Sequence, residues 1–168
     1  MSLTMHQATI PALTRILGAL SKLLDKAAAH CEARKIDPSV LVNYRLAPDM
    51  HPLARQIQIM TDQAKGLAAR LTGSDVPSFP DVETNFEELK ARIAKTADYL
   101  QSFEEAKFDG AEDRSVTLKL GANGELTLTG KDYAFGFSLP NFYFHATTAY
   151  DVLRHAGVEL GKRDFMGM

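Results

Sequence analysis

The sequence predicts an all-α protein: a four-helix bundle with a β-hairpin inserted before the last helix. Four segments repeat apolar residues at the three-four spacing of an amphipathic helix, and one segment alternates apolar and polar residues as strands do. The length of 168 residues is that of a single domain. Four helices with one apolar stripe each bury those stripes by packing together, so we expect one helical bundle domain over residues 1–168.

The first two helices are marked by their apolar stripes and by residues that favour helix ends. The first stripe predicts a helix over residues 11–32 that opens near Thr9, because the proline two positions later is tolerated in a first turn. The second stripe predicts a helix over residues 50–72. Asp49 is its candidate N-cap, and Gly73 is the residue that ends it.

The other two helices carry similar signals. Thr84–Glu87 has a capping-box pattern and opens a predicted helix over residues 84–107. The last helix is predicted over residues 139–156, from Ser138 to Gly157.

The hairpin is predicted over residues 115–130. VTLKL and LTLT alternate apolar and polar residues on either side of a glycine-rich turn at Asn123-Gly124. Because a two-stranded hairpin is marginal on its own, we expect it to lean on the helices. The last residues have no period, and Phe165 and Met166 indicate a tail that docks onto the bundle.

The connection TGSDVPSFPDVE between the second and third helices predicts the topology. About ten extended residues cover roughly 33 Å, which is the length of a helix of about 22 residues. The chain can therefore return along the bundle, and the second and third helices run parallel. The result is an up-down-down-up bundle.

Composition excludes several classes of function. The formal charge of −2 gives no electrostatic reason to expect nucleic acid. Cys31 is the single cysteine, which excludes an intrachain disulfide, a thiolate zinc cage and CxxC redox chemistry. Neither a secretory signal nor an apolar run long enough to span a bilayer is found, so we expect a cytoplasmic protein that does not contact a membrane.

Three stretches together resemble a known family: APDMHPLARQ, FPDVETNFEELKARI and LPNFYFHATTAYDVLRHAGVELGKRDFMG. They are similar to an uncharacterised bacterial domain family of the DinB-like superfamily, and the likeness covers nearly the whole chain. The resemblance implies an up-down-down-up bundle. Many superfamily members carry a divalent-metal triad, with one histidine on the second helix and an HxxxH pair on the fourth, and some are metal-dependent hydrolases or thiol transferases.

The triad that the resemblance implies is not matched residue by residue. The sequence contains no HxxxH, because Ala149 stands four residues after His145. Asp151 and His155 have the required spacing, and His51 could supply a third ligand from the second helix. At about 100° per residue, however, these side chains project away from the apolar stripes. We therefore predict no metal and no cofactor, with a degenerate site at these three residues as the alternative.

His145 is the residue most suited to a ligand or to a polar contact in the core. It falls about 60° from the centre of its stripe, and Gln56 and Gln63 flank the stripe of the second helix in the same way. Polar groups beside a core need partners, so one of these glutamines is expected to pair with His145. His145 is either a packing residue with a satisfied ring, or part of a small-ligand site with Gln56 and Gln63. Arg55, Arg92 and Arg154 are expected to be solvated, although each could reach an anion.

Two function classes remain open. The first is a small-ligand-binding or stress-related domain without catalytic activity and without the metal triad. The alternative is a metal-dependent hydrolase or thiol transferase with a non-standard site. A homodimer is also predicted, because Phe144 and Thr147 fall on the back of the last helix, flanked by Tyr143 and Tyr150. Cover by the hairpin or the tail is the intramolecular alternative.

Overall fold

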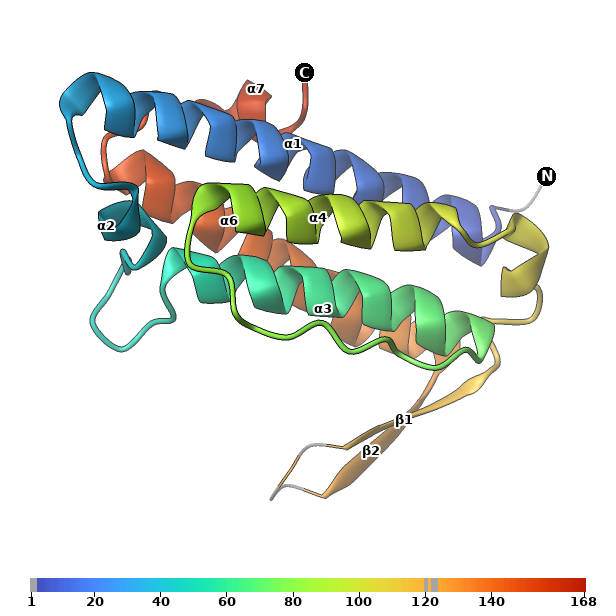
Figure 1. Cartoon of the computed structure of the whole chain (residues 1–168). Coiled ribbons are helices and arrows are strands. Elements are labelled where there is room, and N and C mark those ends of the chain that lie inside the picture. The colour runs from blue at the N-terminus through green and yellow to red at the C-terminus, as the bar shows by residue number, and fades with distance from the viewer. Residues whose placement is uncertain (1–2, 120, 122–123) are drawn as a thin grey trace.

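The computed structural model describes residues 3–119, 121 and 124–168. Its four long helices are α1 (Met5–Arg34), α3 (Leu53–Thr72), α4 (Phe86–Gln101) and α6 (Leu139–His155). Figure 1 shows α1 and α6 running in one direction, and α3 and α4 running in the other. The predicted all-α, up-down-down-up bundle is therefore confirmed.

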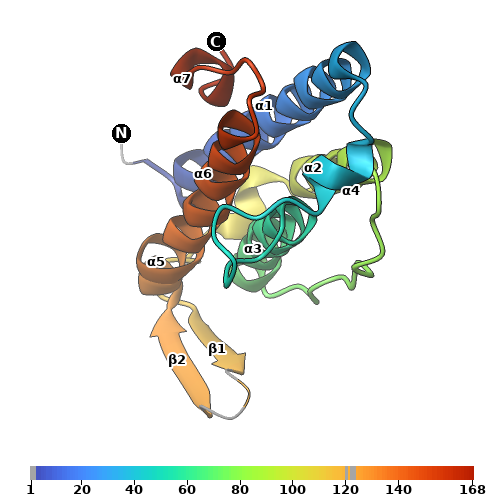
Figure 2. The ribbon, with the colours of Figure 1, turned by 90° about the vertical axis from the view of Figure 1, so that its left-hand side faces the viewer.

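Shorter elements complete the chain, in the order α2 (Pro38–Val42), the 3₁₀ helix η1 (Glu105–Phe108), β1 (Ser115–Lys119), β2 (Glu125–Thr129), α5 (Gly130–Asp132), the π-helix η3 (Tyr133–Ser138) and α7 (Lys162–Phe165). The two strands pair antiparallel, Ser115 opposite Thr129 and Lys119 opposite Glu125, as the predicted hairpin requires. Figures 1 and 2 show the hairpin projecting from one end of the bundle. Of the turn predicted at Asn123-Gly124, Asn123 lies outside the described residues.

The predicted stripes form the core. Every stripe residue of α3 is fully buried, from Leu53 to Leu71, and so are Phe142 and Leu153 on α6. Leu13, Leu17 and other residues of the α1 stripe are buried against them. This dense apolar interior follows from the three-four spacing, because one face of each helix then consists of side chains that water disfavours.

The first helix begins earlier than predicted. Thr4 caps α1 and accepts a hydrogen bond from the backbone N–H of Gln7 at 3.1 Å, while the Gln7 side chain accepts one from the Thr4 backbone N–H. Thr9, the predicted start, is buried inside the helix, and its hydroxyl donates to the Met5 carbonyl at 2.7 Å. The prediction failed because it placed Pro11 in the first turn, whereas α1 accommodates this proline further along.

The second and third predicted helices also differ at their ends. α3 begins at Leu53 and not at residue 50, because the Leu53 N–H donates to the Tyr44 carbonyl at 3.0 Å and needs no cap from Asp49. α4 runs from Phe86 to Gln101, shorter than the predicted 84–107. Its N-cap is Asn85, whose side chain accepts from the Glu88 N–H.

The last helix lacks the predicted start at Ser138. That residue has helical dihedral angles and lies at the end of η3, so the chain is already helical before α6 begins. The Ser138 hydroxyl donates to the Gln63 carbonyl of α3 at 3.2 Å, which uses it for packing between helices and not for capping. A π-helix is a wider turn that is frequent at functional sites.

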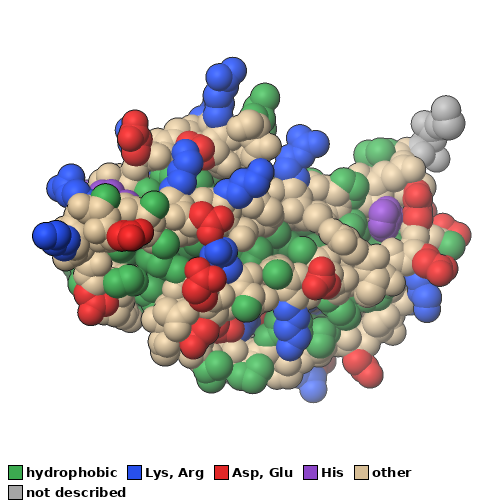
Figure 3. Space-filling view, turned by 45° about the horizontal axis from the view of Figure 1, so that its top comes forward, with side chains coloured by type: hydrophobic (Ala, Val, Ile, Leu, Met, Phe, Trp, Pro, Cys, Tyr) green, Lys and Arg blue, Asp and Glu red, His purple; other side chains and the backbone are tan. Residues whose placement is uncertain are grey.

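On the face in Figure 3, basic and acidic side chains are intermixed, with apolar side chains between them. In the part of the chain described, no helix has both the length and the apolar character needed to cross a membrane.

Candidate functional site

His145 lies on α6, where that helix packs against α3. Its Nδ1 is 2.7 Å from Oε1 of Gln56, the first of the two partners that the sequence suggested. The ring is only half-buried, less than a polar contact within the core would require, while Gln56 is only 1% exposed. The structure therefore brings two of the predicted site residues into contact across the helix seam.

The orientation of the Gln56 amide fixes the state of the imidazole. Gln56 Nε2 donates to the backbone carbonyl of His51 at 2.9 Å, and a carbonyl can only accept. Oε1 must therefore face His145, and the hydrogen of the shared bond belongs to His145 Nδ1. In the neutral ring, Nε2 then carries the lone pair. This nitrogen makes no hydrogen bond with any described residue, and it is not fully buried.

The electrostatic environment keeps this ring neutral. Burial, together with the nearby charges of His51 and Arg55, lowers the pKa of His145 from 6.5 to about 4. At neutral pH the ring is an uncharged hydrogen-bond acceptor. A general base works best when its pKa is near the working pH, so these surroundings suit binding better than proton transfer.

Gln63 does not join His145. It lies seven residues after Gln56 on α3, about 10 Å further along the helix axis. There it lines a separate cavity of about 190 Å³, whose other lining residues are Arg70, Leu118, Lys119, Tyr133 and Phe137. The three residues predicted as one ligand site are therefore divided: His145 and Gln56 meet between α6 and α3, and Gln63 lies at a separate cavity.

The residues of the alternative metal site do not fit a triad. His51 is exposed and precedes α3, and His155 is exposed with its ring 6.0 Å from that of Tyr44. Within the described residues, no three His, Cys, Asp or Glu side chains are grouped closely enough to hold a metal ion. The donor set present thus differs from the superfamily triad, and a protein without metal stays a prediction.

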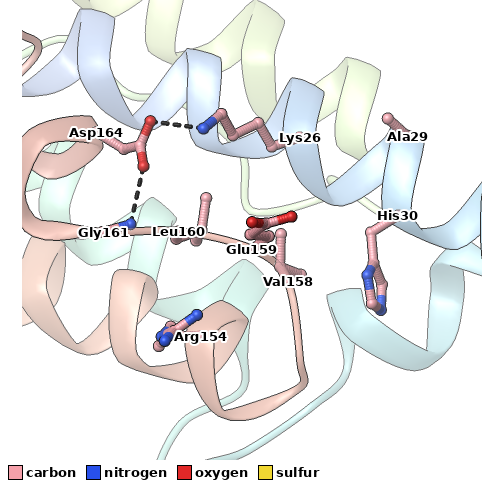
Figure 4. Close-up of a pocket in the computed structure, with 9 residues that line it drawn as sticks. All are labelled: Lys26, Ala29, His30, Arg154, Val158, Glu159, Leu160, Gly161 and Asp164. Atoms are coloured by element: carbon pink, nitrogen blue, oxygen red, sulfur yellow. Dashed lines mark hydrogen bonds and ion pairs between the residues drawn. The ribbon is translucent and has the colours of Figure 1, made fainter.

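A larger cleft lies between α1, α6 and the C-terminal segment (Figure 4). It has a volume of about 720 Å³ and is lined by Lys26, Ala29, His30, Arg154, Val158, Glu159, Leu160, Gly161 and Asp164. Asp164 forms an ion pair with Lys26 at 2.6 Å and accepts a hydrogen bond from the Gly161 N–H at 2.8 Å. Both contacts lower the pKa of Asp164. Lys26 and Asp164 therefore pair with each other and hold the tail in place.

Sequence reasoning missed this cleft. The sequence predicted a tail that docks onto the bundle. The residue that holds the tail there is Lys26 on α1, which pairs with Asp164 more than a hundred positions away. No local pattern could have identified that partner.

Comparison with known proteins gives a consistent result. The sequence profile described as "Domain of unknown function (DUF1993)" matches residues 5–166. A crystal structure of a DinB family member protein from Shewanella denitrificans is similar, with 42% sequence identity and a TM-score of 0.90 over 97% of this chain and 92% of that chain. A search of curated proteins returns no match. With its up-down-down-up bundle and this profile, the chain belongs to the DUF1993 family and has a DinB-like fold.

Proposed function

We propose that this protein is a small-ligand-binding domain without catalytic activity, and that His145 is its recognition residue. One observation carries the proposal: Gln56 and the His51 carbonyl hold the imidazole in a neutral form whose Nε2 lone pair is open to solvent. A fully buried packing histidine would be expected to satisfy both ring nitrogens with protein groups. Here one nitrogen is held by the protein, and the other remains available.

The chemistry of the ligand follows from this arrangement. A neutral Nε2 accepts a hydrogen bond, so the ligand must present an O–H or N–H donor to it. Arg55 lies near enough to affect the pKa of His145, but its guanidinium is engaged with Asp81 and Gln58. A polar, uncharged group such as a hydroxyl or an amide therefore fits this position best.

The test is a screen of small polar metabolites by thermal shift, followed by calorimetric titration of every hit. His145→Gln removes the acceptor nitrogen and should abolish binding while the melting temperature changes little. His155→Gln is the matched control, because it changes an exposed histidine on the same helix and should bind like the wild type. If His145→Gln lowers the melting temperature and leaves every hit bound, His145 is a packing residue and the proposal fails.

The alternative function is a metal-dependent hydrolase or thiol transferase, which the resemblance to the DinB-like superfamily implies. It is tested by measuring the metal content of protein purified without chelators or a histidine-rich tag. We expect less than stoichiometric zinc, nickel or iron. One equivalent that disappears in His51→Ala, Asp151→Ala or His155→Ala would favour the enzyme.

We also propose that the protein forms a homodimer through α6 and η3. Phe144 is 59% exposed and Phe135 is 44% exposed, so the hairpin and the tail leave these two rings uncovered. Tyr143 is 36% exposed and lines a cleft with Phe165 and Met166 of the tail. Tyr150 differs, because Phe165 of the tail packs against it with ring centroids 5.8 Å apart. Sedimentation at micromolar concentration should give a dimer, and Phe144→Lys should give a monomer. A wild-type monomer under these conditions would contradict the proposal.

A further inference from the structure

The cavity that contains Gln63 has an unusual balance of charge. It lies where α3, η3 and the end of β1 meet, and its volume is about 190 Å³. Arg70 and Lys119 are cationic, and none of the lining residues is acidic. This contrasts with the whole chain, which has a formal charge of −2.

Arg70 is the central cation of this cavity. Its Nη1 donates to the hydroxyl oxygen of Tyr133 at 3.0 Å, and it forms no ion pair with a carboxylate of the described residues. Its Nε and Nη2 make no hydrogen bond within the same part of the chain, and they are not fully buried. A guanidinium has donors arranged as a fork, which matches the oxygens of a carboxylate or a phosphate.

Two further donors line the same cavity. Tyr133 is 0% exposed, and its oxygen accepts from Arg70, so its own hydroxyl hydrogen is left without an acceptor among the described residues. The Gln63 side-chain amide also makes no hydrogen bond there and is open to solvent. Buried donors of this kind are normally paired, so a bound acceptor would satisfy the Tyr133 hydroxyl.

The backbone around the cavity makes room for these groups. Gly66 lies one turn before Arg70 on α3, and a Cβ at this position would collide with Arg70 Nη1 and lie 3.7 Å from Tyr133 Oη. Glycine weakens the interior of a helix relative to alanine, so its presence here has a local cost. Tyr133 and Phe137 belong to the π-helix η3, and their rings are stacked with centroids 6.2 Å apart.

We propose that this cavity, formed by Gln63, Arg70, Lys119, Tyr133 and Phe137, binds a small oxyanion. The oxyanion would accept hydrogen bonds from the Arg70 guanidinium, the Tyr133 hydroxyl and the Gln63 amide. The volume is below the roughly 300–1,000 Å³ of sites for drug-sized ligands, which restricts the ligand to inorganic phosphate or a short organic carboxylate. This site is separate from His145 and does not depend on the function proposed for that residue.

The experiment is a calorimetric titration of the full chain with sodium phosphate and, separately, with sodium propionate, at constant ionic strength set by chloride. Saturable binding of one of them is expected. Arg70→Gln should weaken it by about tenfold or more, because it removes a charged donor. Arg154→Gln is the control, since it removes an exposed arginine of the other cleft and should leave the affinity unchanged.

A second variant keeps the test decisive if Arg70→Gln folds poorly. Gly66→Ala favours the helix but displaces the Arg70 guanidinium, so it should weaken binding without lowering the melting temperature. Phosphate binding alone identifies an inorganic ligand, and propionate binding alone identifies a carboxylate. If neither oxyanion saturates the protein, or if both variants bind as tightly as the wild type, the proposal is wrong.

Discussion

At the scale of single residues, the state of His145 is determined by two hydrogen bonds in series. The His51 carbonyl orients the Gln56 amide, and the amide determines which imidazole nitrogen carries the hydrogen. Burial then disfavours a second proton, so the pKa of His145 lies at about 4. The two hydrogen bonds thus set the tautomer and the direction of the free lone pair, and burial keeps the ring uncharged.

This lowered pKa predicts how stability depends on pH. Between about pH 6.5 and pH 4 the unfolded chain protonates this histidine and the folded chain does not, so the free energy of unfolding must fall as the pH is lowered through this range. We expect a loss of about 1–2 kcal/mol, less than the whole shift would give because solvent screens part of the half-buried ring.

The measurement is urea denaturation at a series of pH values, for the wild type and for His145→Gln. The difference between the two curves isolates this residue from the carboxylates that titrate nearby. A difference that does not change between pH 4 and pH 7 would show that the pKa of His145 is not lowered. His155→Gln should follow the wild type throughout.

At the scale of elements, one buried arginine contacts the crossing segment between α3 and α4 at three of its residues. Arg92 of α4 is expected from sequence to be solvated, yet its side chain is only 2% exposed. It donates to the Pro80 carbonyl, and it forms ion pairs with Asp81 and Glu83 of the segment and with Asp62 of α3. These contacts fasten the chain along the bundle, which allows α3 and α4 to run parallel.

Arg92→Met should destabilise the protein strongly. It leaves the largely buried Glu83 without a cation, whereas Asp62 keeps Lys65 and Asp81 keeps Arg55. Breaking a buried ion pair typically costs about 3–5 kcal/mol, and the two remaining cations place the loss at the lower end of this range. Urea denaturation measures this loss. Lys90→Met on the same helix is the control, because its pairs with Asp25 and Glu87 are exposed and should contribute little. Equal stability of the two variants would contradict the role given to Arg92.

The C-terminal element depends on a contact of a different kind. Asp164 joins Lys26 to the Gly161 N–H, and the tail that it holds covers Tyr150 with Phe165. Because these charged groups are partly exposed, they should affect the tail more than the whole bundle.

Asp164→Asn should therefore release α7 locally. Hydrogen exchange at the Gly161 amide should become faster, while exchange in the core of α3 should stay as slow as in the wild type. Native-state exchange followed by NMR measures both in one experiment. Faster exchange throughout the core would show that the tail supports the whole bundle.

At the scale of the whole molecule, four apolar faces close around one interior. The views in Figures 1 and 2 show the helices surrounding this interior, with the hairpin outside it. Cys31 lies in it near the end of α1 and is 1% exposed. Burial raises the pKa of its thiol, and the charge of Asp37 raises it further.

The thiol is thus a reporter of global opening. A thiol reagent should not label Cys31 in the native protein at neutral pH, and it should label it fully in concentrated denaturant. The logarithm of the labelling rate should rise in Arg92→Met in proportion to the lost free energy of unfolding, and the rate should hardly change in Asp164→Asn. Rapid labelling of the native wild type would show that this end of the bundle opens without unfolding.

The sequence by itself determined the four helices, their buried stripes, the hairpin and the parallel course of the second and third helices. Each is a consequence of local periodicity, of turn residues or of the reach of a linker, which can be read from neighbouring positions. The N-terminal ends of the helices were predicted less well. The carbonyl of Tyr44 takes the place of the Asp49 cap at α3. Capping is a competition between acceptors for the free N–H groups, and sequence spacing does not rank those acceptors.

Only the tertiary structure determined which polar side chains contact each other. The bond between Gln56 and His145 joins residues 89 positions apart, and the bond between Arg70 and Tyr133 joins residues 63 positions apart. Helix phase placed Gln56 and Gln63 on the same face of α3, but it could not show that one meets a histidine and the other an arginine-lined cavity. Those partners are set by how far each helix slides along its neighbour, and packing of the whole core fixes that position.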